Sequence, residues 1–130
     1  MNTNVKIFSG VIALLILGMV VAVLLRGSGP TGEGPGFYDE FATCLKDRGA
    51  VFYGAFWCPH CRTQKELFGS SQRLLPYVEC STADGRSQLQ VCKDKDIAGY
   101  PLWEFADSSR LSGEVPLETL AEKTSCVLPE

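Results

Sequence analysis

An apolar run leads directly into two closely spaced cysteines in Ala50-Val51-Phe52-Tyr53-Gly54-Ala55-Phe56-Trp57-Cys58-Pro59-His60-Cys61. The run is typical of a buried strand, and the residues after it, up to Leu67, are typical of a helix. The two thiols therefore lie where a strand turns into a helix N-terminus, whose partial positive charge stabilises a thiolate. A structural disulfide rarely closes so short a loop. The motif indicates redox chemistry, with Cys58 as the attacking thiol and the more buried Cys61 as the resolving thiol.

A second apolar stretch lies near the N-terminus, where Ile7 to Leu25 contains no charged residue. A helix of this length would measure about 28 Å, close to the roughly 30 Å hydrocarbon core of a bilayer. We therefore expect residues 1–26 to form an uncleaved N-terminal membrane anchor. The main alternative is a cleaved signal peptide, but Pro30 would follow a cut at Gly27-Ser28-Gly29, which is unfavourable. A core helix of a soluble domain is a weaker alternative, because this helix would be apolar on every face.

The segment after the expected anchor, residues 27–36, contains five glycines and two prolines and no large apolar residue. This composition is typical of a flexible linker. We expect one globular domain to follow, over residues 37–130. The chain has a formal net charge of −3 and no basic cluster, which argues against a nucleic-acid partner or an anionic lipid surface.

Helical and extended patterns alternate along this domain. Helices are expected at residues 37–46, 59–68, 70–75, 87–93 and 117–124, and strands at 50–56, 77–80, 102–105 and 110–112. This order predicts an α/β fold in which a central mixed sheet is flanked by helices. The last two strands, joined by a turn at Asp107-Ser108-Ser109, would form its antiparallel part.

Two motifs of the chain resemble those of thioredoxin-fold proteins, namely Phe56-Trp57-Cys58-Pro59-His60-Cys61 and Ile97-Ala98-Gly99-Tyr100-Pro101-Leu102. More closely, the domain is similar to the thioredoxin-like domain associated with bacterial and plant vitamin K epoxide reductase homologues. The blocks that carry this likeness are Phe52 to Cys61, Gln64 to Gly69, Leu75 to Cys80 and Gly99 to Trp103. One expected anchor stands in place of the membrane helices of the reductase.

The resemblance implies roles for residues around the dithiol. Pro101 would be a cis-proline that faces the two thiols, and Tyr100 would pair its backbone with a substrate strand. Trp57 would pack beside the site, with a plain core aromatic as the alternative. The Pro-His dipeptide is the one used by DsbA-like oxidants, which implies an oxidising pair. His60, when protonated, would stabilise the Cys58 thiolate, and a solvated histidine with little effect is the alternative.

One position departs from the thioredoxin pattern. Thioredoxins often carry a buried acid on the central strand, six residues before the first cysteine, and Phe52 occupies that position here. Proton transfer to and from Cys61 would then have to use water or another group, such as Glu104.

Four further cysteines, Cys44, Cys80, Cys92 and Cys126, allow three pairings. In the resembling domain the pair Cys80 and Cys92 looks like a structural disulfide, which would contribute roughly 3 kcal/mol. A disulfide between Cys44 and Cys126 would join the two ends of the domain. The helices near these two cysteines could lie on opposite faces of the sheet, so two free buried thiols are the alternative.

A zinc site on Cys58, Cys61 and Cys80 is disfavoured, because Cys80 and Cys92 are too far apart to form a second close pair of ligands. No cofactor is expected. Six cysteines in a small domain indicate an oxidising compartment, which places the domain on the periplasmic or extracytoplasmic side of the membrane.

The combined prediction is a single-pass, membrane-anchored thiol–disulfide oxidoreductase. It would oxidise substrate proteins and be re-oxidised by a quinone-coupled, vitamin K epoxide reductase-like membrane partner. One alternative is a reductase or isomerase, for example in cytochrome maturation. Another is a non-catalytic module that binds peptides beside Tyr100 and Pro101.

Overall fold

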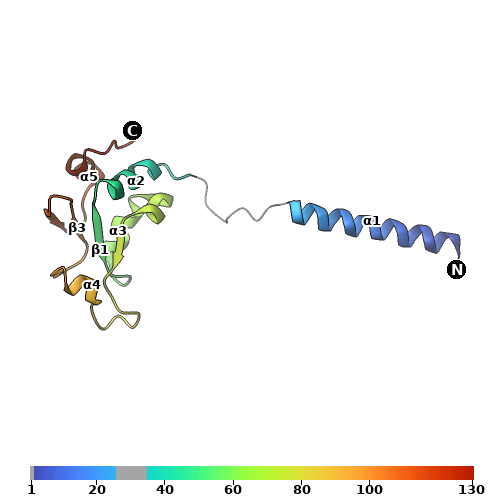
Figure 1. The fold of residues 1–130 in the computed structure, drawn as a ribbon, viewed down its shortest axis with the longest axis horizontal. Helices are drawn as coiled ribbons and strands as arrows, with labels where there is room; N and C mark the ends of the chain where they lie inside the picture. Colours follow the sequence, from blue (N-terminus) through green and yellow to red (C-terminus); the bar gives the residue numbers. More distant parts are fainter. Residues whose placement is uncertain (1, 26–34) are drawn as a thin grey trace. The chain divides into compact units, whose positions relative to one another are not determined.

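The computed structural model describes residues 2–25 and 35–130, and within its first helix it describes the side chains of residues 7–21. The chain divides into two compact units, Met1–Glu33 and Gly34–Glu130. The first unit contains α1 (Thr3–Leu25), labelled in Figure 1. Within the described residues, no helix is both long and apolar enough to cross a membrane, so the predicted anchor is not confirmed. Most of the predicted linker, residues 27–34, lies outside the described part of the chain.

The second unit is built on one four-stranded sheet with the strand order β2-β1-β3-β4. Its strands are β1 (Val51–Gly54), β2 (Tyr77–Glu79), β3 (Leu102–Glu104) and β4 (Arg110–Ser112). Strand β2 runs parallel to β1, whereas β3 runs antiparallel to both β1 and β4. This mixed sheet, with helices beside it in Figure 1, fits the predicted thioredoxin-like fold.

The helical segments of the second unit follow the predicted order. They are α2 (Asp39–Asp47), α3 (Pro59–Glu66), the 3-10 helix η1 (Gly69–Leu74), α4 (Gln90–Lys93) and α5 (Leu117–Thr124). The helix predicted at residues 87–93 begins only at Gln90, because Gln88 pairs with Ser81 in an isolated β-bridge. The strand predicted at residues 50–56 ends at Gly54.

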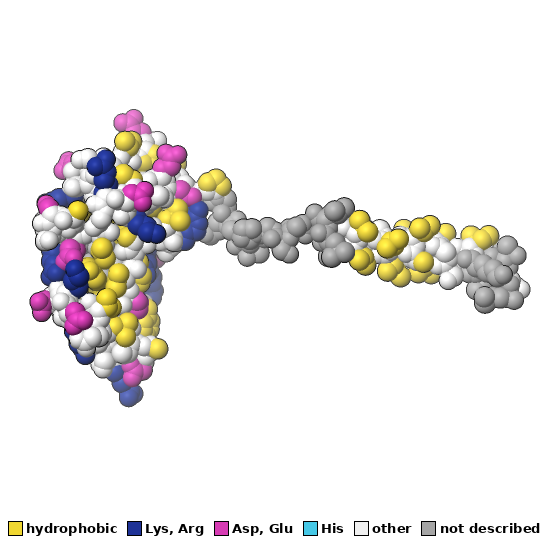
Figure 2. All heavy atoms as spheres, in the orientation of Figure 1, with side chains coloured by type: hydrophobic (Ala, Val, Ile, Leu, Met, Phe, Trp, Pro, Cys, Tyr) yellow, Lys and Arg dark blue, Asp and Glu magenta, His cyan; other side chains and the backbone are white. Residues whose placement is uncertain are grey.

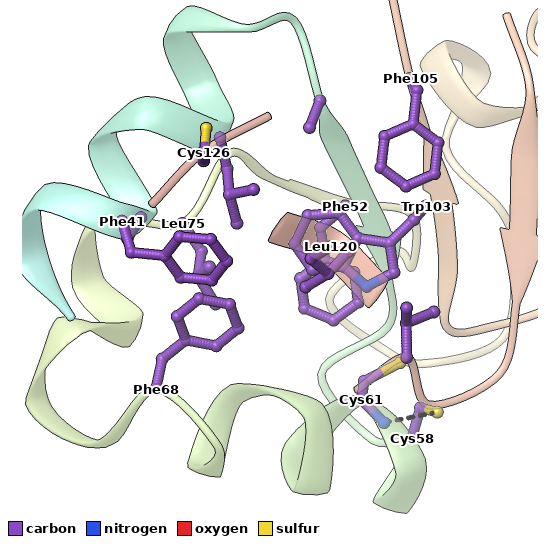
Figure 3. Close-up of a cluster of buried hydrophobic side chains, with 14 of the residues drawn as sticks. Phe41, Phe52, Cys58, Cys61, Phe68, Leu75, Trp103, Phe105, Leu120 and Cys126 are labelled. Carbon is purple, nitrogen blue, oxygen red and sulfur yellow. Dashed lines mark hydrogen bonds between the residues drawn. The ribbon is translucent and has the colours of Figure 1, made fainter. Parts of the chain in front are cut away.

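Hydrophobic side chains are buried on both faces of the sheet, because successive residues of a strand point to opposite sides. On one face, the rings of Phe52 and Trp103 stack with centroids 4.9 Å apart, in a cluster covered by α2, α3 and α5 (Figure 3). On the other face, Tyr53 and Leu102 pack against the Cys80–Cys92 region. Phe52, which replaces the thioredoxin acid, is therefore part of the core.

Two disulfides connect distant parts of the second unit, one between Cys44 and Cys126 and one between Cys80 and Cys92. Side chains of α2 and α5 belong to the same buried cluster, and the two helices contact each other. The idea that the helices near the first pair lie on opposite faces is therefore wrong. Because Cys80 is bonded to Cys92, it cannot also serve as a zinc ligand.

Acidic and basic side chains are interspersed over the face of the second unit that Figure 2 shows. Asp39 and Arg73 form one of the ion pairs, in which the guanidinium donates two hydrogen bonds to the carboxylate at 2.7 and 2.6 Å. The same figure shows the exposed apolar side chains of α1. The visible face of the second unit carries no continuous patch of one charge that would suit a nucleic acid.

Candidate active site

The dithiol lies at the N-terminus of α3, at one edge of the buried cluster in Figure 3. Cys58 is the N-cap residue, and Pro59 follows at a position where a helix needs no backbone N–H. The backbone N–H of Cys61 donates to the sulfur of Cys58 across 3.3 Å. Both cysteines are free thiols in the structure. An otherwise unsatisfied helix N–H thus points at the sulfur that would carry negative charge.

The second thiol has an environment that favours its neutral form. Cys61 is 2% exposed, and burial followed by the hydrogen bond with Cys58 raises the pKa of Cys61 to about 12. At neutral pH Cys61 therefore holds its proton. Attack by Cys61 on a mixed disulfide requires that this proton leave. The site must contain a route for that proton.

His60 points to the surface and is held by an acid that the sequence did not single out. Its Nδ1 lies 2.7 Å from Oε1 of Glu114, which accepts the ring N–H, and the His60 side chain is 69% exposed. Glu114 is kept close because the next residue, Val115, is bonded to the buried side chain of Gln64 on α3. His60 is thus fixed beside the dithiol while its ring stays in solvent.

Trp57 and Tyr100 lie in two different loops, and their side chains contact each other. Their rings make an edge-on contact with centroids 6.0 Å apart, and the indole N–H of Trp57 donates to the hydroxyl of Ser81 across 2.9 Å. Trp57 is 51% exposed, so it is not a plain core aromatic. The hydroxyl of Tyr100 accepts a hydrogen bond from Gln88 at 2.8 Å.

The Tyr100–Pro101 peptide bond is cis. Pro101 is buried and directly precedes β3, whose Leu102 pairs with Tyr53 of β1. The same end of β1 leads into the dithiol turn, because Gly54 follows Tyr53 and a Cβ placed on Gly54 would lie 3.0 Å from the sulfur of Cys61. The sheet therefore brings the proline motif and the dithiol to one end of neighbouring strands.

A shallow hollow lies next to Trp57 and Tyr100 and is closed on its other side by the loop residues 85–88. Gly85 has a φ of +70° in this loop, a conformation that favours glycine, and a Cβ there would lie 3.5 Å from the Trp57 ring. Phe56, also half exposed, extends the apolar surface beside Cys58. Phe56 and Trp57 thus form an exposed aromatic surface directly before Cys58, which is itself 5% exposed.

Glu104 does not take part in this site. It pairs with Val51, at the opposite end of β1 from the dithiol turn. Burial acts to raise the pKa of Glu104, but hydrogen bonds from Arg110 and Lys95 outweigh burial and lower it. The suggestion that Glu104 exchanges a proton with Cys61 is therefore wrong, because its carboxylate is held in surface ion pairs elsewhere.

Sequence reasoning missed Tyr77, which lies near Cys61 at Gly54, and its hydrogen-bond partner Glu79, both on β2. The register of β2 on β1 sets Tyr77 beside Phe52 and Glu79 beside Gly54. The hydroxyl of Tyr77 donates to Glu79 across 2.8 Å. Two features could have identified them: the parallel pairing of β2 with β1, and the two-residue spacing between Tyr77 and Glu79. Together these place both side chains on the face of the sheet that also carries α3.

No family model matches the chain. In an alignment 90 residues long that covers 66% of the chain, it is 44% identical to the thiol-disulfide oxidoreductase LTO1 of Arabidopsis thaliana. This match covers 24% of that protein, so the chain spans about a quarter of the length of this relative. The similarity supports the prediction of an oxidoreductase. The finer resemblance to domains associated with vitamin K epoxide reductase homologues stays a prediction.

Proposed function

We propose that this chain is a thiol–disulfide oxidoreductase in which Cys58 and Cys61 exchange disulfides with other proteins. The observation that carries the proposal is the N–H of Cys61 donating to the Cys58 sulfur at the N-terminus of α3, next to the Tyr100–Pro101 motif. The similarity to a thiol-disulfide oxidoreductase of Arabidopsis thaliana supports the same chemistry.

The exchange runs through one mixed disulfide. When the Cys58–Cys61 disulfide oxidises a substrate, a substrate thiolate attacks the sulfur of Cys58, and the electron pair leaves on Cys61, which then takes up a proton. A second substrate thiolate attacks the substrate sulfur of the mixed disulfide and releases Cys58 as a thiolate. The substrate gains a disulfide, and the protein is left with two reduced cysteines.

The surface around Cys58 supports a polypeptide as the substrate. Phe56 and Trp57 expose large apolar rings directly before the attacking cysteine. The hollow beside Tyr100 adjoins this surface and adds polar side chains, among them Ser81 and Gln88. Aromatic side chains supply contact area to many sequences, which suits an enzyme that acts on varied unfolded chains. The backbone next to Pro101 would pair with the substrate strand.

We also propose that oxidation is the physiological direction and that a vitamin K epoxide reductase-like membrane protein re-oxidises the dithiol. The Pro59-His60 dipeptide and the sequence resemblance support this proposal. Attachment to the membrane through residues 1–26, a linker at residues 27–36 and an extracytoplasmic domain at 37–130 belong to the same proposal. It rests on the uncharged run from Ile7 to Leu25 and on the two disulfides beyond the dithiol.

Trapping of mixed disulfides tests the exchange chemistry. The variant Cys61→Ala should accumulate covalent adducts between Cys58 and its substrates or its oxidising partner, seen on non-reducing gels and released by reductant. The variant Cys58→Ala should accumulate none. With glutathione disulfide as the oxidant, the wild-type chain should also catalyse oxidation of a reduced, unfolded protein, and neither variant should. If wild type oxidises the substrate no faster than Cys58→Ala does, a non-catalytic peptide-binding module becomes the better account.

A separate measurement tests the membrane part of the proposal. Full chain expressed in cells should stay in the membrane pellet after extraction at alkaline pH, whereas a chain that starts at residue 35 should be released. Release of the full chain would contradict anchoring and leave the exchange chemistry untouched.

A further inference from the structure

The acid missing from the position of Phe52 has a counterpart on the neighbouring strand. Phe52 and Gly54 lie on the same face of β1, and their partners in the register, Tyr77 and Glu79, lie on the matching face of β2. That face also carries Cys61, which belongs to the same buried cluster as Phe52. An acid therefore stands on β2, on the same face of the sheet as Phe52 and Cys61.

Gly54 has no side chain, and this allows Tyr77 of β2 to come near the thiol of Cys61. A Cβ on Gly54 would lie 3.0 Å from the sulfur of Cys61 and 3.3 Å from the hydroxyl oxygen of Tyr77. Both atoms therefore surround the same small space above the glycine. A proton can pass between them through one bridging water.

The far end of this path is a carboxylate that is held in place by backbone donors. Glu79 Oε2 accepts the Tyr77 hydroxyl at 2.8 Å, and Oε1 accepts the backbone N–H groups of Ser81 at 2.8 Å and Phe56 at 3.2 Å. Glu79 is only partly buried, so a proton that arrives there can exchange with solvent. The side chains thus connect a buried thiol to the surface.

The charged and titratable groups around this path come from α3, its N-cap residue and β2. Lys65 of α3 lies 3.4 Å from the centre of the Tyr77 ring, and its charge favours the Cys61 thiolate. Cys58 acts in the other direction on Cys61 through its hydrogen bond and its charge. Burial and then the bond to Glu79 raise the pKa of Tyr77, which keeps its hydroxyl protonated and donating to Glu79.

We propose that Tyr77 and Glu79 form the proton relay of Cys61, an inference that rests on the exchange chemistry proposed above. When Cys61 attacks a mixed disulfide at Cys58, its S–H bond breaks and the proton passes through a bridging water to the Tyr77 oxygen, while the Tyr77 proton moves to Glu79. The Cys58–Cys61 bond forms, and the bond from Cys58 to the partner sulfur breaks with the electron pair on the leaving sulfur. In the opposite direction Glu79 and Tyr77 return the proton to Cys61.

A reaction in which each of two steps releases a coloured product allows the proton transfer from Cys61 to be measured separately. Reduced full-length chain is mixed with the aromatic disulfide dithiobis-nitrobenzoate, which releases one coloured thiolate when Cys58 attacks and a second when Cys61 closes the protein disulfide. The second step is unimolecular and is absent in Cys61→Ala. Its rate, measured against pH, reports how easily Cys61 loses its proton.

The variants Glu79→Gln and Tyr77→Phe keep the size of each side chain. Each should slow the second step by about tenfold or more at about neutral pH, and the gap to wild type should close as rising pH lets solvent remove the proton. Because both residues serve one path, the double variant should be little slower than either single variant. Glu104→Gln, on the same sheet but in surface ion pairs, is the matched control and should leave the second step unchanged.

Three outcomes would distinguish failure of the proton relay from failure of the exchange function. If wild type shows no second step, the proposed exchange function itself fails. If wild type shows it and either Glu79→Gln or Tyr77→Phe has an unchanged rate, the relay is wrong while the function stands. A slowing that is the same at every pH would also overturn the relay, because it would indicate a purely structural role.

Discussion

The side chain of Gln64 is bonded twice to the backbone of Val115, with its amide nitrogen donating to the carbonyl at 3.0 Å and its oxygen accepting the N–H at 2.6 Å. Gln64 is fully buried on α3, and Val115 lies in the loop before α5. One amide thus satisfies both backbone groups of a residue far away in sequence. It fixes α3, and with it the dithiol, against the segment that carries Glu114.

Replacing Gln64 should be costly for this reason. Gln64→Leu leaves the N–H and the carbonyl of Val115 buried without partners, so the free energy of unfolding should fall by about 3 kcal/mol. Urea unfolding followed by tryptophan fluorescence measures the change. Gln72→Leu, at an exposed position on η1, is the matched control and should change the stability by less than about 0.5 kcal/mol. Equal stability of the two variants would show that the double bond to Val115 contributes little.

The buried thiol predicts how stability depends on pH. The pKa of Cys61 rises from about 9 to about 12 on folding, mainly through burial, so the folded state holds this proton more tightly than the unfolded state. The resulting stabilisation is complete below about pH 9 and is lost as the pH rises toward 12. Cys58→Ala, in which Cys61 is the remaining free thiol, should therefore lose stability above pH 9 faster than Cys58→Ala/Cys61→Ala. An equal loss of stability in both variants above pH 9 would contradict a raised pKa of Cys61.

Much of the site was predictable because it is local in sequence. Cys58 and Cys61 follow one strand and begin one helix, so their placement depends on a short segment. The position of Glu79 depends instead on how β2 pairs with β1, and a shift of this register by one residue would turn its side chain to the other face. The sequence pattern alone does not specify that register.

The pairing of Cys44 with Cys126 likewise depends on tertiary packing that the sequence pattern does not specify. These residues are 82 positions apart, and their pairing depends on α2 and α5 packing on the same face of the sheet. Helical periodicity indicates which side of each helix is apolar but not which face of the sheet it covers. The contact of Glu114 with His60 could not be predicted from the sequence either, because it forms only through the packing of α3 against the loop before α5.

His60 should tune the redox potential of the dithiol. A protonated ring beside Cys58 favours the thiolate and thus the reduced state, so His60→Ala should make the potential more negative, by on the order of 10–20 mV for a partly screened charge. Equilibration against glutathione, with the dithiol state read from tryptophan fluorescence, measures the shift. The shift should shrink in high salt, because the ring is mostly exposed. A potential that is the same in both proteins at low salt would indicate a solvated histidine without influence.

Gly54 is the position where the sheet and the dithiol approach most closely. In Gly54→Ala the new methyl group would lie 2.8 Å from the Tyr77 ring, closer than real contacts allow, and 3.0 Å from the sulfur of Cys61, which is a tight contact. Strand pairing to β1 limits how far Tyr77 can move, so we expect a loss of about 1–3 kcal/mol in stability and a slower closure of the Cys58–Cys61 disulfide.

Gly99→Ala is the matched control for this substitution. Gly99 also lies near the site, directly before Tyr100, but a Cβ there would meet no atom within 4 Å. Its thermal unfolding and the rate of disulfide closure should match wild type. If Gly54→Ala behaved like Gly99→Ala, the space between β1, Tyr77 and Cys61 would be wider than the structure shows, and the proposed path of the Cys61 proton to Tyr77 would lose its geometric basis.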